Sequence, residues 1–581
     1  TSATSHGVSA SALDASTFCT LRSRARKAGP PRPLGWIMAM AAATRMGTLA
    51  NAMSDERDRG TRETAEPTSS HRSAAAAGWE CPEVGTFRAL IPKDSHPLSW
   101  LSPVPLWKAR NDVLARWLGD PTNAERRRWV ASQRARGIDP HFTVRSHADH
   151  DRVSLLVLGD PGEGDASQYC VVPGLLRKAE DTSFMVIASD VIYPAGDSDE
   201  YGDKFYRPYQ DYPRPIFAVP GNHDWYDGLN GFMRHFCGAD RELREPPEIG
   251  RRSFFRDLMW WLFWRDAPRP REARFRRMRG LRGRPEQQAE QPGPYFAIEA
   301  GPVLLVGVDT GITGDLDRDQ GAWLERISRG SPKPKILITG VPIYANGAYD
   351  PGRIEGSPST VDDIVAAPEH NYIAVIGGNI HNYQRYPVRL PDGRTILHLV
   401  SGGGGAFMHP THVIPRVDLP GMGEESFRCY PNRGDSLSIV SQIYQRRLGW
   451  LLGCRFIPPD QAAALVAERL GTAPARQADR AATVSDAARR TTATIFGLPT
   501  RFPGELQEYV RRFFDWNDPP MFKSFLRVDA SPDEVAIRCF AATGCRPQEV
   551  DPPLEDELRC LHRADGRWAW VPEVTTTRKD T

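Results

Sequence analysis

Apolar runs of strand length, each ending in a turn that carries metal-ligating side chains, recur along the middle of this chain. The run 215–218 stops at a Pro-Gly turn that leads directly into Asn222, His223 and Asp224. A Pro-Gly pair ends a strand, and open α/β sheets bind ligands beyond the carboxyl ends of their strands. These three side chains supply an amide oxygen, an imidazole and a carboxylate. Taken alone, they could equally form a turn with a helix cap.

Two upstream runs end in the same way. Residues 153–158 stop at Gly159-Asp160, and residues 184–188 stop at Ser189-Asp190. The segment between them, 169–180, is long enough for a crossover helix. A strand, a helix and a strand at this spacing indicate a βαβ unit in a parallel sheet.

Two downstream runs continue the pattern. Residues 335–339 end at Gly340, and residues 372–376 lead into Gly-Gly-Asn379-Ile-His381. Because the carboxyl ends of parallel strands share one edge of a sheet, the residues that follow these strands should lie together. The sequence therefore predicts a metal site at that edge.

The motif order Gly-Asp-x-Gly, Asp-x-x-Tyr, Gly-Asn-His-Asp and Gly-x-x-His resembles the calcineurin-like metallophosphoesterases, most closely their purple-acid-phosphatase branch. The resemblance spans about residues 153–410. It implies an α/β fold, a four-layer α/β/β/α sandwich, that hydrolyses a phosphate ester with metal-activated water. It also implies four ligands for a first ion, which would be Fe, Mn or Zn: Asp160, Asp190, Tyr193 and His381.

The second metal position departs from the family pattern. The resemblance places a bridging Asp190, Asn222 and two histidines there, but the histidines fall on Gly340 and Asn379. The remaining donors, Asp190, Asn222 and the Asn379 side chain as a further candidate, are all oxygens, which suits Mn or Mg held weakly. The chain is then either an enzyme with a weak second site or an inactive member of the fold that binds a phosphate ligand or a partner.

A histidine elsewhere could replace the missing ligands. The glycine-rich run 402–405 follows the next predicted strand and is followed by His409 and His412. Glycines allow the backbone to approach a neighbouring group closely. We rank simple weakening of the second site above this compensation.

Three further residues receive catalytic roles. His223 would stabilise the phosphoryl group or protonate the leaving oxygen, and Asp224 would orient it. Arg385 would bind the phosphate as a fork, although it could equally pair with a carboxylate. The family resemblance implies a phosphoester or a phosphorylated small molecule as the substrate.

The rest of the chain is assigned by composition and pattern. We expect a disordered segment at 1–85, a helical extension at 86–150, the core at 151–415 with an insertion at 251–292, a helical insertion at 416–505, and strands completing the second sheet at 506–581. Residues 22–43 imitate a signal peptide, but their apolar part is short. The nine cysteines are scattered and form no Cys-x-x-Cys pair, so the cytoplasm is favoured over secretion.

The insertion contains the most unusual composition. Aromatic residues at 254–264 are followed by nine arginines between Arg265 and Arg284. This segment could touch a membrane surface or an anionic partner, or it could be a buried aromatic helix followed by a solvated loop. A formal net charge of only +2 gives no indication of nucleic-acid binding.

Overall fold

The computed structural model describes residues 79, 81–93, 98, 100, 102–240, 259, 262–265, 271–475, 482–497 and 516–571. The chain divides into two compact units, Thr1–Arg62 and Glu63–Thr581, and the described residues all belong to the second. Most of the segment predicted to be disordered, residues 1–78, lies outside the described residues. Among the residues described, no helix combines the length and apolar character needed to cross a membrane.

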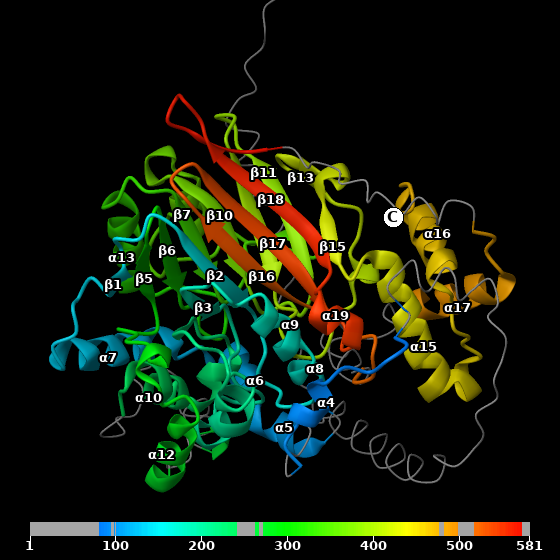
Figure 1. Ribbon diagram of the computed structural model, residues 1–581, viewed down its shortest axis with the longest axis horizontal. Helices are drawn as coiled ribbons and strands as arrows, with labels where there is room; N and C mark the ends of the chain where they lie inside the picture. The colour runs from blue at the N-terminus through cyan, green and yellow to red at the C-terminus, as the bar shows by residue number, and fades with distance from the viewer. Residues whose placement is uncertain are drawn as a thin grey trace, which may run out of the picture. The chain divides into compact units, whose positions relative to one another are not determined.

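Two large sheets form the centre of the second unit (Figure 1). The seven-stranded sheet has the order β19 (Trp568–Trp570), β18 (Leu554–His562), β17 (Glu534–Ala542), β16 (Lys523–Ala530), β2 (Val153–Leu158), β3 (Phe184–Ile187) and β4 (Ile216–Ala218). The eight-stranded sheet has the order β1 (Thr143–His147), β5 (Phe296–Ala300), β6 (Val303–Val308), β7 (Lys335–Thr339), β10 (Tyr372–Gly377), β12 (Thr395–Ser401), β11 (Tyr383–Arg389) and β15 (Arg428–Tyr430).

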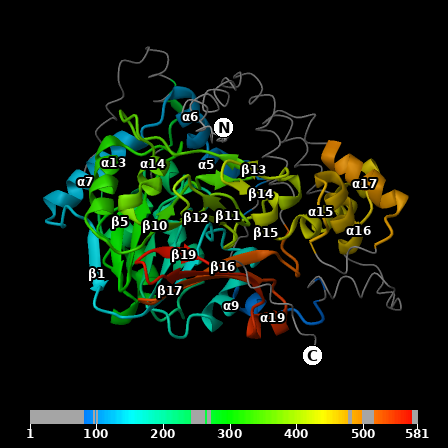
Figure 2. The ribbon, with the colours of Figure 1, turned by 90° about the horizontal axis from the view of Figure 1, so that it is seen from above.

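Helices cover the outer faces of both sheets. Figure 2 shows α13 (Arg318–Arg329) and α14 (Val361–Ala366) on one side, and α9 (Val171–Arg177) and α19 (Arg546–Val550) on the other. The facing surfaces of the sheets pack into a large apolar core that includes Leu155, Val157 and Val186. This arrangement confirms the predicted four-layer α/β/β/α fold.

The strands that position the site are largely apolar and buried, as expected for strands covered on both faces. β2, β3 and β4 pair in parallel, as do β6, β7, β10 and β12. Strands buried on both faces have near-continuous apolar runs, as the sequence shows here. α8 (Ala166–Tyr169) and α9 make the crossover between β2 and β3. The late strand β16 pairs antiparallel with β2, so the end of the chain borders the first strand of the site.

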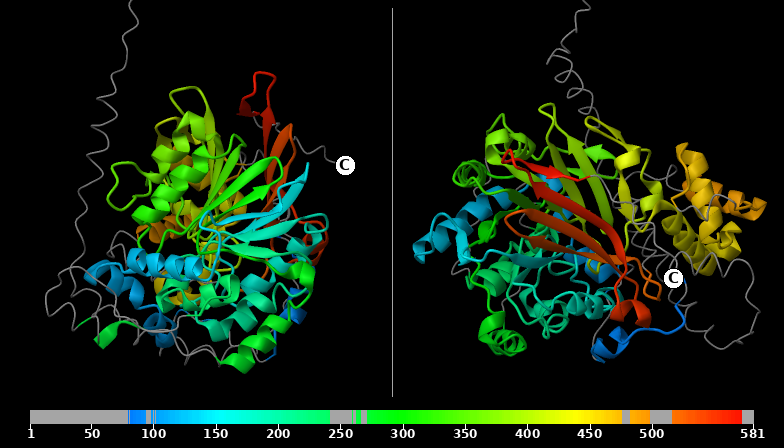
Figure 3. Two further views of the ribbon diagram at one scale, coloured as in Figure 1. Left: turned by 90° about the vertical axis from the view of Figure 1, so that its left-hand side faces the viewer. Right: turned by 45° about the horizontal axis from the view of Figure 1, so that its top comes forward.

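Helices from three other parts of the chain lie around the sheets (Figures 1 and 3). They are α4 (Phe87–Leu90), α5 (Pro103–Lys108), α6 (Asn111–Leu118), α7 (Thr122–Ala135), α10 (Asn230–Cys237), α12 (Glu272–Gly280), α15 (Arg433–Leu452), α16 (Pro459–Leu470) and α17 (Asp486–Gly497). Two short hairpins pair β8 (Tyr344–Ala345) with β9 (Ala348–Tyr349) and β13 (Asp418–Leu419) with β14 (Met422–Gly423). The fully buried Arg126 of α7 bonds to Asp309 at 2.8 Å and Asp317 at 3.0 Å, which holds α7 on the core.

Two of the described cysteines are paired. Cys81 and Cys545 form a disulfide with their Cα atoms 5.3 Å apart. Disulfides are characteristic of oxidising compartments, so this pair does not support the expected cytoplasmic location, which stays a prediction. Sequence spacing could not reveal this pair, because 464 residues separate the two positions.

Candidate metal centre

The loops that follow β2 and β3 hold Asp160 and Asp190 in a strained backbone conformation. Their φ angles are 55° and 36°, in the left-handed region that non-glycine residues rarely adopt. Such strain costs about 1–3 kcal/mol per residue and persists only where the surroundings fix it. Here the Asp160 carboxylate accepts the Asn379 backbone N–H at 2.8 Å, and the Asp190 carboxylate accepts that of His223 at 2.8 Å.

Four side chains converge at this point. The Tyr193 hydroxyl lies 3.0 Å from Asp190 Oδ2, 3.4 Å from Asp160 Oδ1 and 3.0 Å from His381 Nε2. Ligand atoms of Asp160, Asp190 and His381 all lie within 4.8 Å of one another. The structure therefore brings together the four side chains predicted for the first ion.

The orientation of His381 suits a ligand. Its Nδ1 lies 2.8 Å from the Phe407 carbonyl oxygen. A carbonyl can only accept, so Nδ1 carries the hydrogen and Nε2 presents its lone pair to the cluster. Burial lowers the pKa of His381 well below its usual value, and nearby His409 lowers it further, so the ring stays neutral. A neutral imidazole is the form that binds metals.

The electrostatics of the cluster also suit a cation. Asp160 is completely buried, and Asp190 is 1% exposed. Burial raises the pKa of Asp160 well above its usual value, and the neighbouring Asp190 raises it further. A cation between the two carboxylates would remove this penalty, because it favours the ionised form of both. The residues present therefore fit a metal ion.

Two buried oxygens lie at or beside the residues predicted to hold a second ion. Asn222 Oδ1 and Thr310 Oγ1 are buried, and neither has a hydrogen-bond partner among the described residues. A Cβ atom added to Gly340 would lie 2.6 Å from Thr310 Oγ1 and 3.1 Å from the Pro220 carbonyl oxygen. The Thr310 hydroxyl thus occupies space that a side chain at position 340 would enter. Sequence reasoning did not select Thr310, because its motif position resembles an ordinary turn.

Asn379 contacts the Asp160 carboxylate through its backbone N–H group. Its φ of 63° turns the backbone N–H toward Asp160, whose two carboxylate oxygens accept it at 3.0 and 2.8 Å. The side chain is half-buried, and no hydrogen bond of its amide is recorded in the described part of the chain. Its predicted role as a ligand of a second ion stays a prediction.

The environment of His223 corrects one predicted interaction. Its Nδ1 donates to the Pro194 carbonyl oxygen at 2.8 Å, so a backbone carbonyl orients the ring. Asp224 instead accepts three backbone N–H groups, from Val191 at 2.9 Å, Ile192 at 3.2 Å and Gly221 at 3.0 Å. Asp224 therefore ties the loop of Asp190 to the loop of Asn222, and the prediction that it orients His223 is wrong.

Arg385 is a second correction. Its guanidinium, 4% exposed, donates to both oxygens of the buried Asp556 on β18, at 2.9 and 3.2 Å. β11 directs this side chain into the space between the sheets, where the late strands supply a carboxylate. The alternative of a carboxylate partner is correct, and the predicted phosphate fork is wrong.

His409 and His412, the two candidate replacements for the missing second-site histidines, differ in position. The ring of His409 stacks on His381 with centroids 4.2 Å apart, and its Nδ1 accepts the His381 backbone N–H. His412 bonds to Ser436 on α15 at 2.9 Å. Neither belongs to the group of ligand atoms that lie within 4.8 Å of one another.

Two features that composition alone did not reveal close the site. Trp100, 2% exposed, makes edge contacts with the rings of Tyr193, His223 and Phe407 at 5.7–5.9 Å. Its Nε1 donates to Glu163 at 2.8 Å. The glycine-rich run approaches the Asp160 loop, since a Cβ on Gly402 would lie 2.6 Å from Asp160 Oδ2. Trp100 belongs to the segment 86–150, for which the sequence predicted only a helical extension.

Some arginines of the arginine-rich insertion bond within the fold, and others are exposed to solvent. Residues 254–258, 260–261 and 266–270 lie outside the described residues. Arg265 pairs with buried Asp197, and buried Arg282 donates to backbone carbonyls, so both belong to the fold. Arg276 and Arg277 on α12 are exposed.

The central part of the chain is similar to one known protein family. Residues 153–383 match the family described as calcineurin-like phosphoesterase. A search of curated protein sequences finds no match.

Several solved structures match parts of this chain at low sequence identity. A purple acid phosphatase, PPD1, from yellow lupin (Lupinus luteus) seeds is 11% identical, with 71% of this chain and 54% of that protein covered and a TM-score of 0.34. PhoD is 9% identical, with 74% of each chain covered and a TM-score of 0.33. GAP50, the anchor in the inner membrane complex of Plasmodium, is 12% identical, with 48% of this chain and 77% of that protein covered and a TM-score of 0.27. This chain thus spans about half of the lupin enzyme.

Proposed function

We propose that residues 153–383, which match the calcineurin-like phosphoesterase family, hydrolyse phosphate esters with water activated by a metal ion. The observation that carries this proposal is the convergence of Asp160, Asp190, Tyr193 and His381 on one buried point. The motif order favours the purple-acid-phosphatase-like branch.

The donor set suits Fe, Mn or Zn, because it combines two carboxylates, a phenol and an imidazole. When bound, the ion would supply Lewis-acid activation of water and of the phosphoryl oxygens. Asn222 Oδ1 and the bridging Asp190 would hold a second ion weakly, and Mn or Mg suits these oxygen donors.

His223 is the chain's own acid–base group in this proposal. Its Nδ1 is fixed on the Pro194 carbonyl, and its ring lies 4.5 Å from that of Tyr193, centroid to centroid. Its Nε2 would either donate a proton to the leaving oxygen or donate a hydrogen bond that stabilises the charged phosphoryl group. Trp100 would exclude water from this side of the site, since it packs against both rings.

A second candidate is a phosphate-binding protein of the same fold without turnover. The glycine at 340 and the asparagine at 379, in place of the imidazoles that the family resemblance implies, favour it. Contact of the exposed arginines of α12 with an anionic partner or membrane surface would be compatible with either candidate.

The test is hydrolysis of an aryl phosphate by metal-stripped protein resupplied with Fe, Mn²⁺, Zn²⁺ or Mg²⁺. Turnover that depends on the ion and is lost in Asp190→Asn would support the enzyme. The matched control is Asp227→Asn, a buried carboxylate that caps α10 and lies outside the donor set. Metal binding without turnover under any ion would establish the second candidate.

A further inference from the structure

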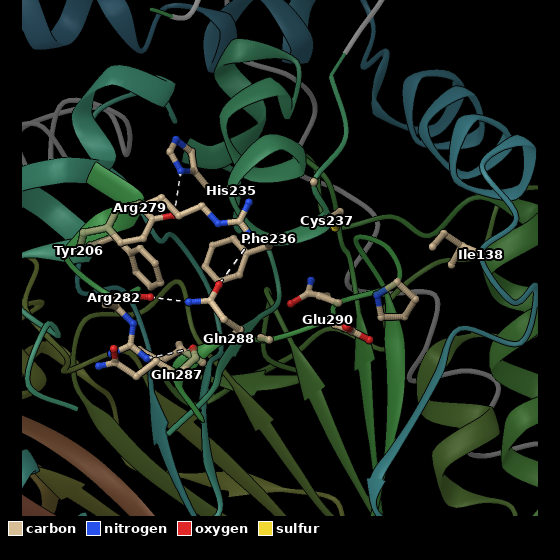
Figure 4. A pocket seen from close by; sticks show the side chains of 16 residues that line it. Ile138, Tyr206, His235, Phe236, Cys237, Arg279, Arg282, Gln287, Gln288 and Glu290 are labelled. Carbon is tan, nitrogen blue, oxygen red and sulfur yellow. Dashed lines mark hydrogen bonds between the residues drawn. The ribbon is translucent and has the colours of Figure 1, made fainter. Parts of the chain in front are cut away.

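A pocket of about 390 Å³ lies between α10, α12 and residues 287–292 (Figure 4). Its volume is within the range of small-molecule sites in proteins. None of its lining residues belongs to the metal centre. The pocket is therefore a separate cavity to which the phosphoesterase site assigns no role.

Much of the pocket wall is apolar. Phe205 and Phe236 pack with their ring centroids 5.1 Å apart, and Ile138 and Ile216 add aliphatic surface. The Tyr206 hydroxyl is 3.2 Å from His235 Nδ1, so this pair satisfies its own polar atoms. A hydrophobic body could bury surface here without leaving those polar groups unsatisfied.

Arginines line another side of the pocket. Arg279 of α12 is exposed, and within the described part of the chain it forms no ion pair; its one recorded hydrogen bond is a long contact of 3.5 Å with Gln288. Arg282 is buried and donates to the carbonyls of Tyr212 at 2.9 Å and Arg214 at 2.7 Å.

The guanidinium of Arg282 has hydrogen-bond partners, but no negative charge balances it among the described residues. Carbonyl oxygens satisfy its N–H groups, yet no described carboxylate forms an ion pair with it. Burial lowers its pKa to about 10, and the guanidinium is still charged at neutral pH. An anion in the adjacent pocket would compensate this charge and that of Arg279.

Glu290 limits what the rest of the pocket accepts. In Figure 4, Arg279 and Arg282 lie toward one side, and Glu290 and Ile138 lie toward the other. A second anionic group at the Glu290 side would be repelled. The lining therefore suits one negative charge attached to a neutral, apolar body.

We propose that this pocket binds a small amphipathic organic anion, with its carboxylate, sulfonate or phosphate beside Arg279 and its apolar body against Phe205 and Phe236. The site does not depend on the phosphoesterase proposal. α12 thereby acquires a defined role: its arginine at 279 faces the ligand, while those at 276 and 277 face solvent.

The test is calorimetric titration with octyl sulfonate, which cannot be hydrolysed, below its micelle concentration. The protein is the full chain carrying Asp190→Asn and stripped of metal, so that the metal centre cannot account for binding. We expect saturable binding that weakens about 10-fold or more in Arg279→Gln, the effect of losing one charge-assisted hydrogen bond. Arg276→Gln, an exposed arginine of the same helix outside the pocket, should bind as tightly as the parent.

Two further probes separate the charge from the apolar body. Octanol and inorganic phosphate each lack one half of the proposed ligand, and each should bind at least 10-fold more weakly than octyl sulfonate. Binding of octanol as tight as that of octyl sulfonate would overturn the proposal. Equal affinities of Arg279→Gln and Arg276→Gln, or no binding of octyl sulfonate, would also overturn it.

Discussion

The substitution Asp224→Asn distinguishes a structural role of this carboxylate from the catalytic role that its motif suggests. Asp224 Oδ2 accepts the N–H groups of Val191 and Gly221, and Oδ1 accepts that of Ile192. These donors lie in the two loops that carry Asp190 and Asn222. In Asp224→Asn, the remaining amide oxygen can still accept two of these backbone N–H groups. The new NH₂ group, however, faces the third N–H group and cannot accept its hydrogen bond.

The expected cost follows from these contacts. One hydrogen bond to a charged acceptor is lost, a buried N–H faces another donor, and two remaining bonds become neutral. Losing the bond to the charged acceptor costs roughly 1.5–3 kcal/mol, and weakening each of the other two bonds costs roughly 0.5–1 kcal/mol, so the total should be about 2.5–5 kcal/mol. Because both ligand loops shift, metal affinity should fall by about 10–100-fold, the usual effect of groups that orient ligands.

The assay combines urea denaturation of metal-free protein with metal competition titrations. Asp227→Asn is the matched control, since Asp227 also accepts two backbone N–H groups, from Asn230 and Gly231, but caps α10. The control should lose stability and keep its metal affinity. Unchanged stability and metal affinity in Asp224→Asn, with a loss of kcat alone, would refute the structural role and restore the orientation of His223.

Three other outcomes are expected. His223→Ala should lower kcat by about 10²–10⁴ with metal still bound, and an unchanged kcat would leave His223 as a turn former. Thr310→Ala/Gly340→His/Asn379→His should bind one more equivalent of Zn²⁺, because the alanine clears the 2.6 Å contact; no gain would mean that positions 340 and 379 are misaligned with the family ligands. Burial lowers the pKa of His398 to about 3, so the folded state binds fewer protons than the unfolded state below pH 6.5. Stability should therefore fall by about 2 kcal/mol between neutral pH and pH 5 relative to His398→Phe, and parallel pH profiles of the two proteins would contradict this.

The strands and the first donor set could be predicted because each depends on local sequence. Apolar runs covered on both faces mark β2, β3 and β10, and parallel pairing brings their carboxyl ends to one edge. Asp160, Asp190 and His381 meet for that reason.

What the sequence did not reveal depends on contacts between distant segments. Arg385 meets Asp556 only because β18 arrives 171 residues later in the opposite sheet. Cys81 meets Cys545 across 464 residues, and Trp100 reaches Tyr193 from the helical extension. Asp224 resembled a partner of His223 because they are adjacent in sequence, whereas the fold turns its carboxylate toward three backbone N–H groups.

Metal content tests the central claim most directly, because the proposed function depends on the four converging side chains. Full-length protein reconstituted with Fe, Mn²⁺ or Zn²⁺ and then desalted should retain at least about one equivalent of one of these ions by elemental analysis. Asp190→Ala should retain none, because Asp190 serves both positions, and Asp227→Ala should retain the parent's content. Full metal content in folded Asp190→Ala, or no bound ion in the parent, would contradict the account.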